Sequence, residues 1–182
     1  MSIDGGLKLI LVREHLLDIP DCHFPNGYSL QWYLPGMEND WLRIHEKAEK
    51  YQKIDFEKYE KEFSSHKEDL RQRQCFIMND RQEFVGTGTA WFDTLLMGEG
   101  YGRVHWVAII PEEQGKKLSN YLLFSLLQKL KILGYRKAYL TTSTKRESAI
   151  CLYLKFGFLP LLEDPETCIA WTEYLLNKKK NE

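Results

Sequence analysis

One stretch of this sequence limits the fold more than any other, because an apolar run at 107–110 ends at Pro111 and leads into a helix that begins near Gln114. The start of a helix leaves several backbone N–H groups without partners, and the helix dipole adds partial positive charge there. Lys116 and Lys117 add two full positive charges. The junction therefore predicts a site for a phosphate or a pyrophosphate. Many strand-to-helix turns bind nothing, so the residues alone leave a purely structural turn open.

Hydrophobic periodicity predicts the rest of the secondary structure. Alternating apolar and polar residues predict strands, whereas apolar residues at steps of three and four predict amphipathic helices. Strands are expected at 28–34, 75–78, 83–92, 103–110, 136–142, 158–162 and 167–175. Helices are expected at 37–51, 56–63, 114–133 and 144–156, with a polar linker at 64–73. This order predicts an α/β (α+β) chain with a mixed sheet and helices on its faces.

Length, composition and charge exclude several classes of protein. With 182 residues, 43% of them hydrophobic, the chain suits one domain and is not intrinsically disordered. Twenty-five basic residues against 26 acidic ones give a net charge of −1, which excludes a dedicated nucleic-acid-binding domain. The early apolar run at 9–12 is too short for a membrane span or a signal peptide. We therefore expect a soluble, cytoplasmic protein with neither nucleic acid nor membrane as its partner.

The four cysteines are widely separated and form no Cys-x-x-Cys pair. This spacing predicts neither a zinc site nor a redox motif, so no metal is expected, and reduced thiols in a cytoplasm are the simpler account.

The chain resembles the GNAT (GCN5-related) N-acetyltransferases in two motifs. Residues 114–119, preceded by the strand and the proline, resemble the acetyl-CoA-binding pattern of Gln or Arg, two residues, Gly, one residue, then Gly or Ala. Residues 149–158 resemble the family's Ala-x-x-x-Tyr-x-Lys-x-Gly-Phe helix. The two motifs stand in the right order, separated by one helix and one strand, which makes them more specific together than either is alone.

The resemblance implies a GNAT-like acyl-CoA N-acyltransferase fold, with a central, mostly antiparallel sheet, splayed strands and flanking helices. The domain would cover 28–176, followed by a solvated tail at 177–182. The helices at 37–63 lie where the family shapes its acceptor site. Residues 1–27 are an N-terminal extension outside the resemblance, and the sequence leaves open whether they form a covering strand or a lid.

The resemblance also implies a function, the direct transfer of an acetyl group from acetyl-CoA to a primary amine of a small molecule or peptide. Acetyl-CoA would lie between the strands at 103–110 and 136–142, with its pantetheine arm bonded to the backbone of the first strand, as strand addition to an open edge allows. The residues expected to bind it are Val107, Ala108, Ile109, Gln114, Gly115, Lys116, Lys117, Leu118, Ser119 and Arg146.

Two residues are candidates for proton transfer. Tyr153 matches the family's frequent general acid, which protonates the departing thiolate, and a core tyrosine is the structural alternative. His105 is the candidate base, because its ordinary pKa near 6.5 suits proton transfer at neutral pH and some family members carry a histidine at this place. A structural histidine is the alternative. Cys151, which invites a covalent acetyl-enzyme, is better explained by packing.

Three positions depart from the family pattern. Lys117 stands where glycine is usual, and Ser119 stands where glycine or alanine is usual. Arg146 stands where the second motif often has asparagine. Lys117 either weakens the pyrophosphate cradle or compensates through its charge, as Lys116 and Arg146 would. The departures keep open a non-catalytic acyl-CoA-binding module with a degenerate pyrophosphate loop, and a domain that keeps the fold alone. The sequence also leaves open whether the protein is a monomer or a homodimer.

Overall fold

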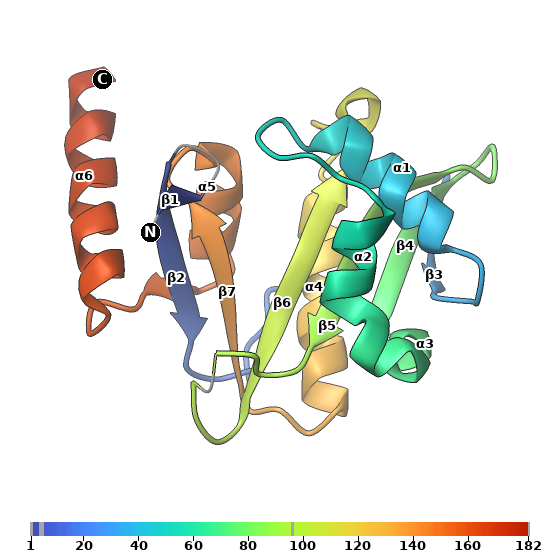
Figure 1. Ribbon diagram of the computed structural model, residues 1–182, viewed down its shortest axis with the longest axis horizontal. Helices are drawn as coiled ribbons and strands as arrows, with labels where there is room; N and C mark the ends of the chain where they lie inside the picture. Colours follow the sequence, from blue (N-terminus) through green and yellow to red (C-terminus); the bar gives the residue numbers. More distant parts are fainter. Residues whose placement is uncertain (1, 4–5, 96, 182) are drawn as a thin grey trace.

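The computed structural model describes residues 2–3, 6–95 and 97–181 and builds one mixed sheet covered by helices (Figure 1). The strands are β1 (Ser2–Ile3), β2 (Gly6–Arg13), β3 (Tyr28–Trp32), β4 (Gln74–Asn79), β5 (Phe84–Trp91), β6 (Tyr101–Ile109), β7 (Lys137–Ser143) and β8 (Leu159–Pro160). The helices are α1 (Glu38–Ala48), α2 (Phe56–Phe63), α3 (Leu70–Arg73), α4 (Leu118–Ile132), α5 (Glu147–Lys155) and α6 (Pro165–Asn181), with 3-10 turns η1 (Ser64–Asp69) and η2 (Pro111–Glu113).

The sheet has the strand order β1-β2-β7-β6-β5-β4-β3, and β8 pairs with β2. Neighbouring strands run antiparallel except for β6 and β7, which are parallel. In Figure 1, α4 covers one face of the sheet while α1 and α2 cover the other. Leu122 and Leu126 of α4, and Trp41 and Phe63 of α1 and α2, are fully buried in the same core. The α/β prediction with a mostly antiparallel sheet is confirmed.

The two parallel strands part after a short contact, as Figure 1 shows. Their register runs only from Tyr101 opposite Lys137 to Arg103 opposite Tyr139. Beyond it, β6 carries a bulge in its pairing with β5, where Gly88 faces both Trp106 and Val107, and Trp106 has a φ of 47°. A bulge bends its strand and increases the local twist. The bend directs the second half of β6 away from β7.

The N-terminal extension contributes a strand of the main sheet. Residues 6–13 form β2, which pairs with β7 over six residue pairs, from Lys8 opposite Ser143 to Arg13 opposite Ala138. Leu9 and Leu11 of this strand are fully buried. Residues 6–13 of the extension are therefore part of the sheet.

The strand predicted at 167–175 is wrong, because these residues belong to α6. The carboxylate of Asp164 accepts a hydrogen bond from the backbone N–H of Thr167 at 2.8 Å, which is the geometry of a helix cap. Thr167, Ala170 and Tyr174 are buried at helical spacing. The β-branched and aromatic residues of the segment suggested a strand, but the helix lets one face pack on β2.

Smaller differences concern the segments beside these elements. The strand predicted at 158–162 is reduced to the two residues of β8. The linker predicted at 64–73 forms η1 and α3, and Leu70 within it is fully buried. Residues 177–181, expected in the solvated tail, continue α6. Within the described ranges, no helix combines the length and the apolar character that crossing a membrane requires.

The burial of β2 predicts that it is essential for stability. Leu9→Ala removes a fully buried side chain and should lower the free energy of unfolding by about 3 kcal/mol. Leu17→Ala is the matched control, because Leu17 is 79% exposed, and it should change the same quantity by less than about 0.5 kcal/mol. Urea unfolding followed by circular dichroism measures both. Equal, small effects in the two variants would contradict an integral strand.

Candidate active site

A cavity of about 910 Å³ lies where β6 and β7 part. Its walls come from four places: the two strands, the end of α1 with the loop that follows, the side of α2, and the start of α5. Its lining includes His45, Glu49, Lys58, Glu62, Arg103, His105, Val107, Ala108, Ile109, Gln114, Thr141, Arg146 and Tyr153. Both predicted proton-transfer residues and five of the ten predicted cofactor residues therefore share one cavity.

The loop between β6 and α4 keeps an unusual backbone. Gly115 has a φ of 80°, and Lys117, directly before α4, has a φ of 63° in the left-handed region. The backbone N–H groups of Gly115, Lys116 and Lys117 donate no hydrogen bond to any described residue. The side-chain amide of Gln114 donates to the carbonyl of Ile109 at 3.0 Å and ties the loop to the strand. Lys117 thus adopts the conformation for which glycine is favoured, and the free N–H groups suit a pyrophosphate.

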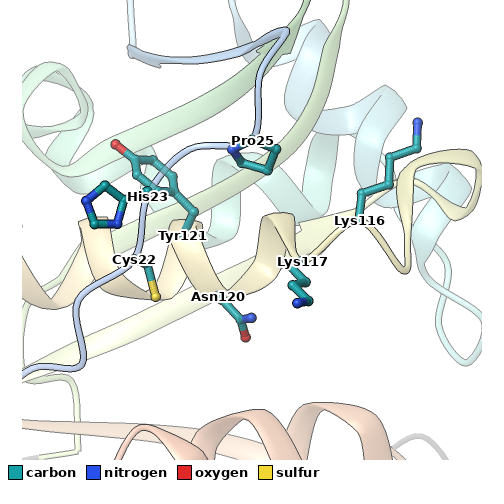
Figure 2. Close-up of a pocket in the computed structure, with 7 residues that line it drawn as sticks. All are labelled: Cys22, His23, Pro25, Lys116, Lys117, Asn120 and Tyr121. Carbon is teal, nitrogen blue, oxygen red and sulfur yellow. The ribbon is translucent and has the colours of Figure 1, made fainter.

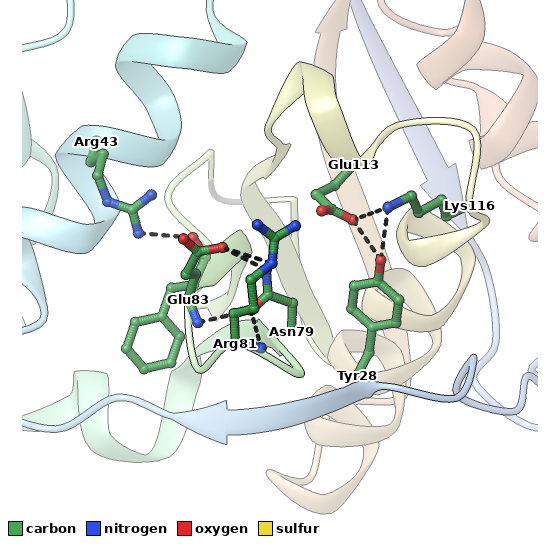
Figure 3. A network of polar contacts seen from close by, with 8 residues as sticks. Tyr28, Arg43, Asn79, Arg81, Glu83, Glu113 and Lys116 are labelled. Atoms are coloured by element: carbon green, nitrogen blue, oxygen red, sulfur yellow. Dashed lines mark hydrogen bonds and ion pairs between the residues drawn. The ribbon is translucent and has the colours of Figure 1, made fainter.

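The two lysines of this loop lie outside the main cavity. The Lys116 ammonium donates to the Glu113 carboxylate at 2.7 Å and to the Tyr28 hydroxyl at 3.1 Å, as Figure 3 shows. Lys116 and Lys117 border a second, smaller pocket of about 340 Å³, drawn in Figure 2. The other residues of that pocket are Cys22, His23, Pro25, Asn120 and Tyr121. Whether Lys116 and Lys117 contact a phosphate stays a prediction.

Arg146 is engaged across the cavity. Its guanidinium forms an ion pair with the Glu49 carboxylate at 2.7 Å, and the Glu49 side chain is only 4% exposed. The same carboxylate accepts hydrogen bonds from the backbone N–H groups of Lys50 and Tyr51, both at 2.9 Å. These contacts tie the loop after α1 to the start of α5. Arg146 remains a predicted phosphate ligand, with Glu49 as its present partner.

His105 is paired with a carboxylate from the other side of the core. Its Nε2 lies 2.9 Å from Oε2 of Glu62 on α2. Burial lowers the pKa of His105 to about 4, so its imidazole is neutral at pH 7. Burial is the largest influence on Glu62 and opposes its ionisation, but the contacts with His105 and the charge of Lys58 together outweigh burial, and the pKa of this carboxyl falls to about 2. A neutral imidazole oriented by a carboxylate is suited to accept a proton.

A second histidine of the cavity was missed by the sequence analysis. His45 on α1 is 3% exposed, and burial lowers its pKa to about 3. Its Nε2 has no hydrogen-bond partner among the described residues, and its ring centre lies 5.1 Å from that of Trp106. One sequence signal could have identified it: His45 follows Trp41 and Ile44 on the apolar stripe of the helix, where a polar side chain is unusual.

Tyr153 reaches the cavity from α5. The residue is 9% exposed, and burial raises the pKa of its phenol to about 12, so the hydroxyl keeps its proton at neutral pH. Within the described part of the chain, its hydroxyl makes no hydrogen bond, which leaves it free to donate to a ligand. Cys151, two residues earlier on the same helix, is exposed and does not line the cavity.

Comparison with known proteins agrees with the geometry of this cavity and loop. Residues 35–158 match the Acetyltransferase (GNAT) family, so the chain belongs to this family. It is 26% identical over 155 residues to a mycothiol acetyltransferase of Paenarthrobacter aurescens, and 26% identical over 166 residues to one of Pseudarthrobacter chlorophenolicus. Each match covers 78% of this chain and 45% of the relative. The chain thus spans less than half the length of these two relatives.

Solved structures share the fold at low identity. A GCN5-related N-acetyltransferase from Sphaerobacter thermophilus gives a TM-score of 0.69 at 19% identity, covering 85% of this chain and 49% of that one. The ribosomal-protein-S18-alanine N-acetyltransferase of Escherichia coli gives 0.55 at 16% identity, covering 71% and 76%. At these identities the likeness confirms the GNAT fold alone.

The two buried histidines predict how stability depends on pH. Both have folded-state pKa values below the ordinary 6.5, so the unfolded chain binds more protons as the pH falls. Stability should therefore be full above pH 6.5 and decline toward pH 4, by up to about 1.4 kcal/mol per pH unit for each histidine. His45→Gln and His105→Gln should each flatten this decline in urea unfolding series. A wild-type stability that is constant between pH 7 and pH 4.5 would contradict buried, neutral imidazoles.

Proposed function

We propose that this chain transfers an acetyl group from acetyl-CoA directly to a primary amine of a small molecule or peptide. The observation that carries the proposal is one cavity lined by the edge of β6, the neutral His105 and the protonated Tyr153. The loop before α4, in which Lys117 has a left-handed backbone conformation, adjoins this cavity. Each part corresponds to one requirement of acyl transfer: a site for the donor, a proton acceptor and a proton donor.

The backbone of β6 supports binding of the donor. Beyond Arg103, β6 has no pairing with β7, so the edge at 104–109 has backbone groups available for an extended pantetheine arm. The N–H groups of 115–117 have no acceptor among the described residues, which supports their donating to the pyrophosphate. The left-handed conformation of Lys117 argues against a degenerate loop, because the backbone shape is kept without glycine.

The proposed chemistry follows from the protonation states of the two residues. The amine nitrogen attacks the acetyl carbon, the carbon–sulfur bond breaks, and the sulfur leaves as a thiolate. His105 takes the proton of the amine, and its Nδ1 is the nitrogen left for this task because Nε2 is bonded to Glu62. The Glu62 carboxylate stabilises the resulting imidazolium. Tyr153 gives its proton to the thiolate.

Acetyl-CoA should stabilise the folded chain. A ligand that binds only the folded state adds RT ln(1 + [L]/Kd), which is about 2.7 kcal/mol at a hundredfold excess over Kd. We therefore expect a clear rise in melting temperature with acetyl-CoA, measured by calorimetry. Pantetheine, which lacks the pyrophosphate, is the matched control ligand and should give a smaller rise in melting temperature. No rise at millimolar acetyl-CoA would refute both the enzyme and the acyl-CoA-binding module.

Tyr153→Phe should slow turnover without weakening donor binding. The variant removes only the hydroxyl, so thiol release from acetyl-CoA in the presence of a turned-over amine should fall roughly a hundredfold. The Kd for acetyl-CoA should stay unchanged. Tyr174→Phe is the control, because Tyr174 lies on the buried face of α6, is 5% exposed and does not line the cavity. Wild-type rates in Tyr153→Phe would remove this residue from the mechanism. Binding without thiol release from a panel of amines, amino acids and peptides would favour the binding module.

A further inference from the structure

A cationic side chain lies at the point where β6 and β7 part. Arg103 belongs to the last residue pair of the two strands, and it lines the cavity. Its guanidinium donates to two neutral hydroxyls, Thr94 Oγ1 at 2.8 Å and Thr141 Oγ1 at 3.1 Å. The Nε of Arg103 is buried and finds no hydrogen-bond partner among the described residues. Burial lowers the pKa of this guanidinium, because water solvates its positive charge poorly at this place.

The carboxylates around Arg103 are engaged elsewhere. Glu62 is bonded to His105 and lies 3.7 Å from the Lys58 ammonium. Asp93 accepts from the backbone N–H groups of Leu95 and Gly98. Neither forms an ion pair with Arg103 in the described part of the chain. Charges that are largely shielded from water in proteins are normally paired, so a half-buried arginine that has only hydroxyl partners in a cavity indicates an anionic ligand.

The position of Arg103 separates this anion from the phosphates of the donor. Ile109 follows Arg103 by six residue steps along the strand, a span of about 20 Å, and the pyrophosphate loop comes after that. Arg103 and His105 are two residues apart on β6 and therefore lie on the same face, toward α2. The Cα atoms of these two residues are therefore about 7 Å apart. At this spacing, one small molecule can contact His105 with its amine and Arg103 with a nearby carboxylate.

We propose that the amine acceptor carries a carboxylate close to its amine, as a free amino acid does, and that Arg103 binds this carboxylate. This inference rests on the proposed function, and it assigns the substrate class of the same cavity. The guanidinium offers planar, paired donors that match a carboxylate, and His105 then faces the amine. Arg103 is a specificity-determining residue here and takes no part in proton transfer.

The test compares free amino acids with their carboxamides as acceptors, with thiol release as the assay. The carboxamide keeps the amine and the side chain and removes only the negative charge. We expect the acids to exceed the amides by at least about tenfold in kcat/KM, chiefly through KM. Amides that serve as well as the acids, or turnover confined to amines without a carboxylate, would overturn the proposal.

Variants assign the preference to Arg103. In Arg103→Gln the ratio of acid to amide should fall to about one, and in Arg103→Lys, which keeps the charge, part of the ratio should remain. Arg136→Gln is the matched control, because this arginine is 71% exposed and pairs with Glu99 at the surface. A full preference for acids in Arg103→Gln would overturn the assignment, and the wild-type comparison decides the substrate class even if that variant does not fold.

A binding measurement distinguishes failure of this inference from failure of the proposed function. If no amine releases thiol, calorimetric titration of the same acids and amides into the protein with saturating CoA replaces the assay. Binding of acids to the wild type, lost in Arg103→Gln, would support the carboxylate site although the transfer reaction had failed. Absence of any difference between acids and amides in this titration would overturn the site itself.

Discussion

The separation of two neighbouring strands is the constraint on which the rest of this structure depends. β6 and β7 are held together by three residue pairs, and the bulge at Trp106 and Val107 then bends β6 away. A sheet that opens in this way exposes backbone hydrogen-bonding groups, which in a folded protein need a partner. The cavity between the strands is where a ligand can supply that partner, and the loop before α4 continues it with three further N–H groups.

Opening a sheet in its middle weakens it, and the elements on either side compensate. On the side of β7 that faces away from β6, β2 forms six residue pairs with β7, and α6 packs against β2. On the side of β6, aromatic side chains of α2 pack edge to face around Trp41 of α1, which is fully buried. The ion pair of Arg146 with Glu49 connects these two sides across the cavity. The strands can part because each is fixed by its own neighbours.

Three buried polar atoms of the cavity lining have no hydrogen-bond partner among the described residues: His45 Nε2, Trp106 Nε1 and Arg103 Nε. His105 and Glu62 orient each other, and burial keeps the imidazoles of His45 and His105 neutral. The guanidinium of the half-buried Arg103 donates only to hydroxyls among the described residues. A cation that has no ion-pair partner in the described part of the chain, beside a neutral base, suits a ligand with one anionic and one basic group, which is a narrower class than the family fold itself specifies.

The sequence by itself determined what depends on neighbours along the chain: the strand, turn and helix around Gln114, the helix that carries Tyr153, and the family to which they point. Local preference also misled, since α6 has the composition of a strand and is helical because one face packs on β2. Glu62 reaches His105 from 43 residues away, and β2 reaches β7 from more than a hundred. Only the tertiary structure decided these contacts, because packing brings together side chains whose separation along the chain carries no periodic signal.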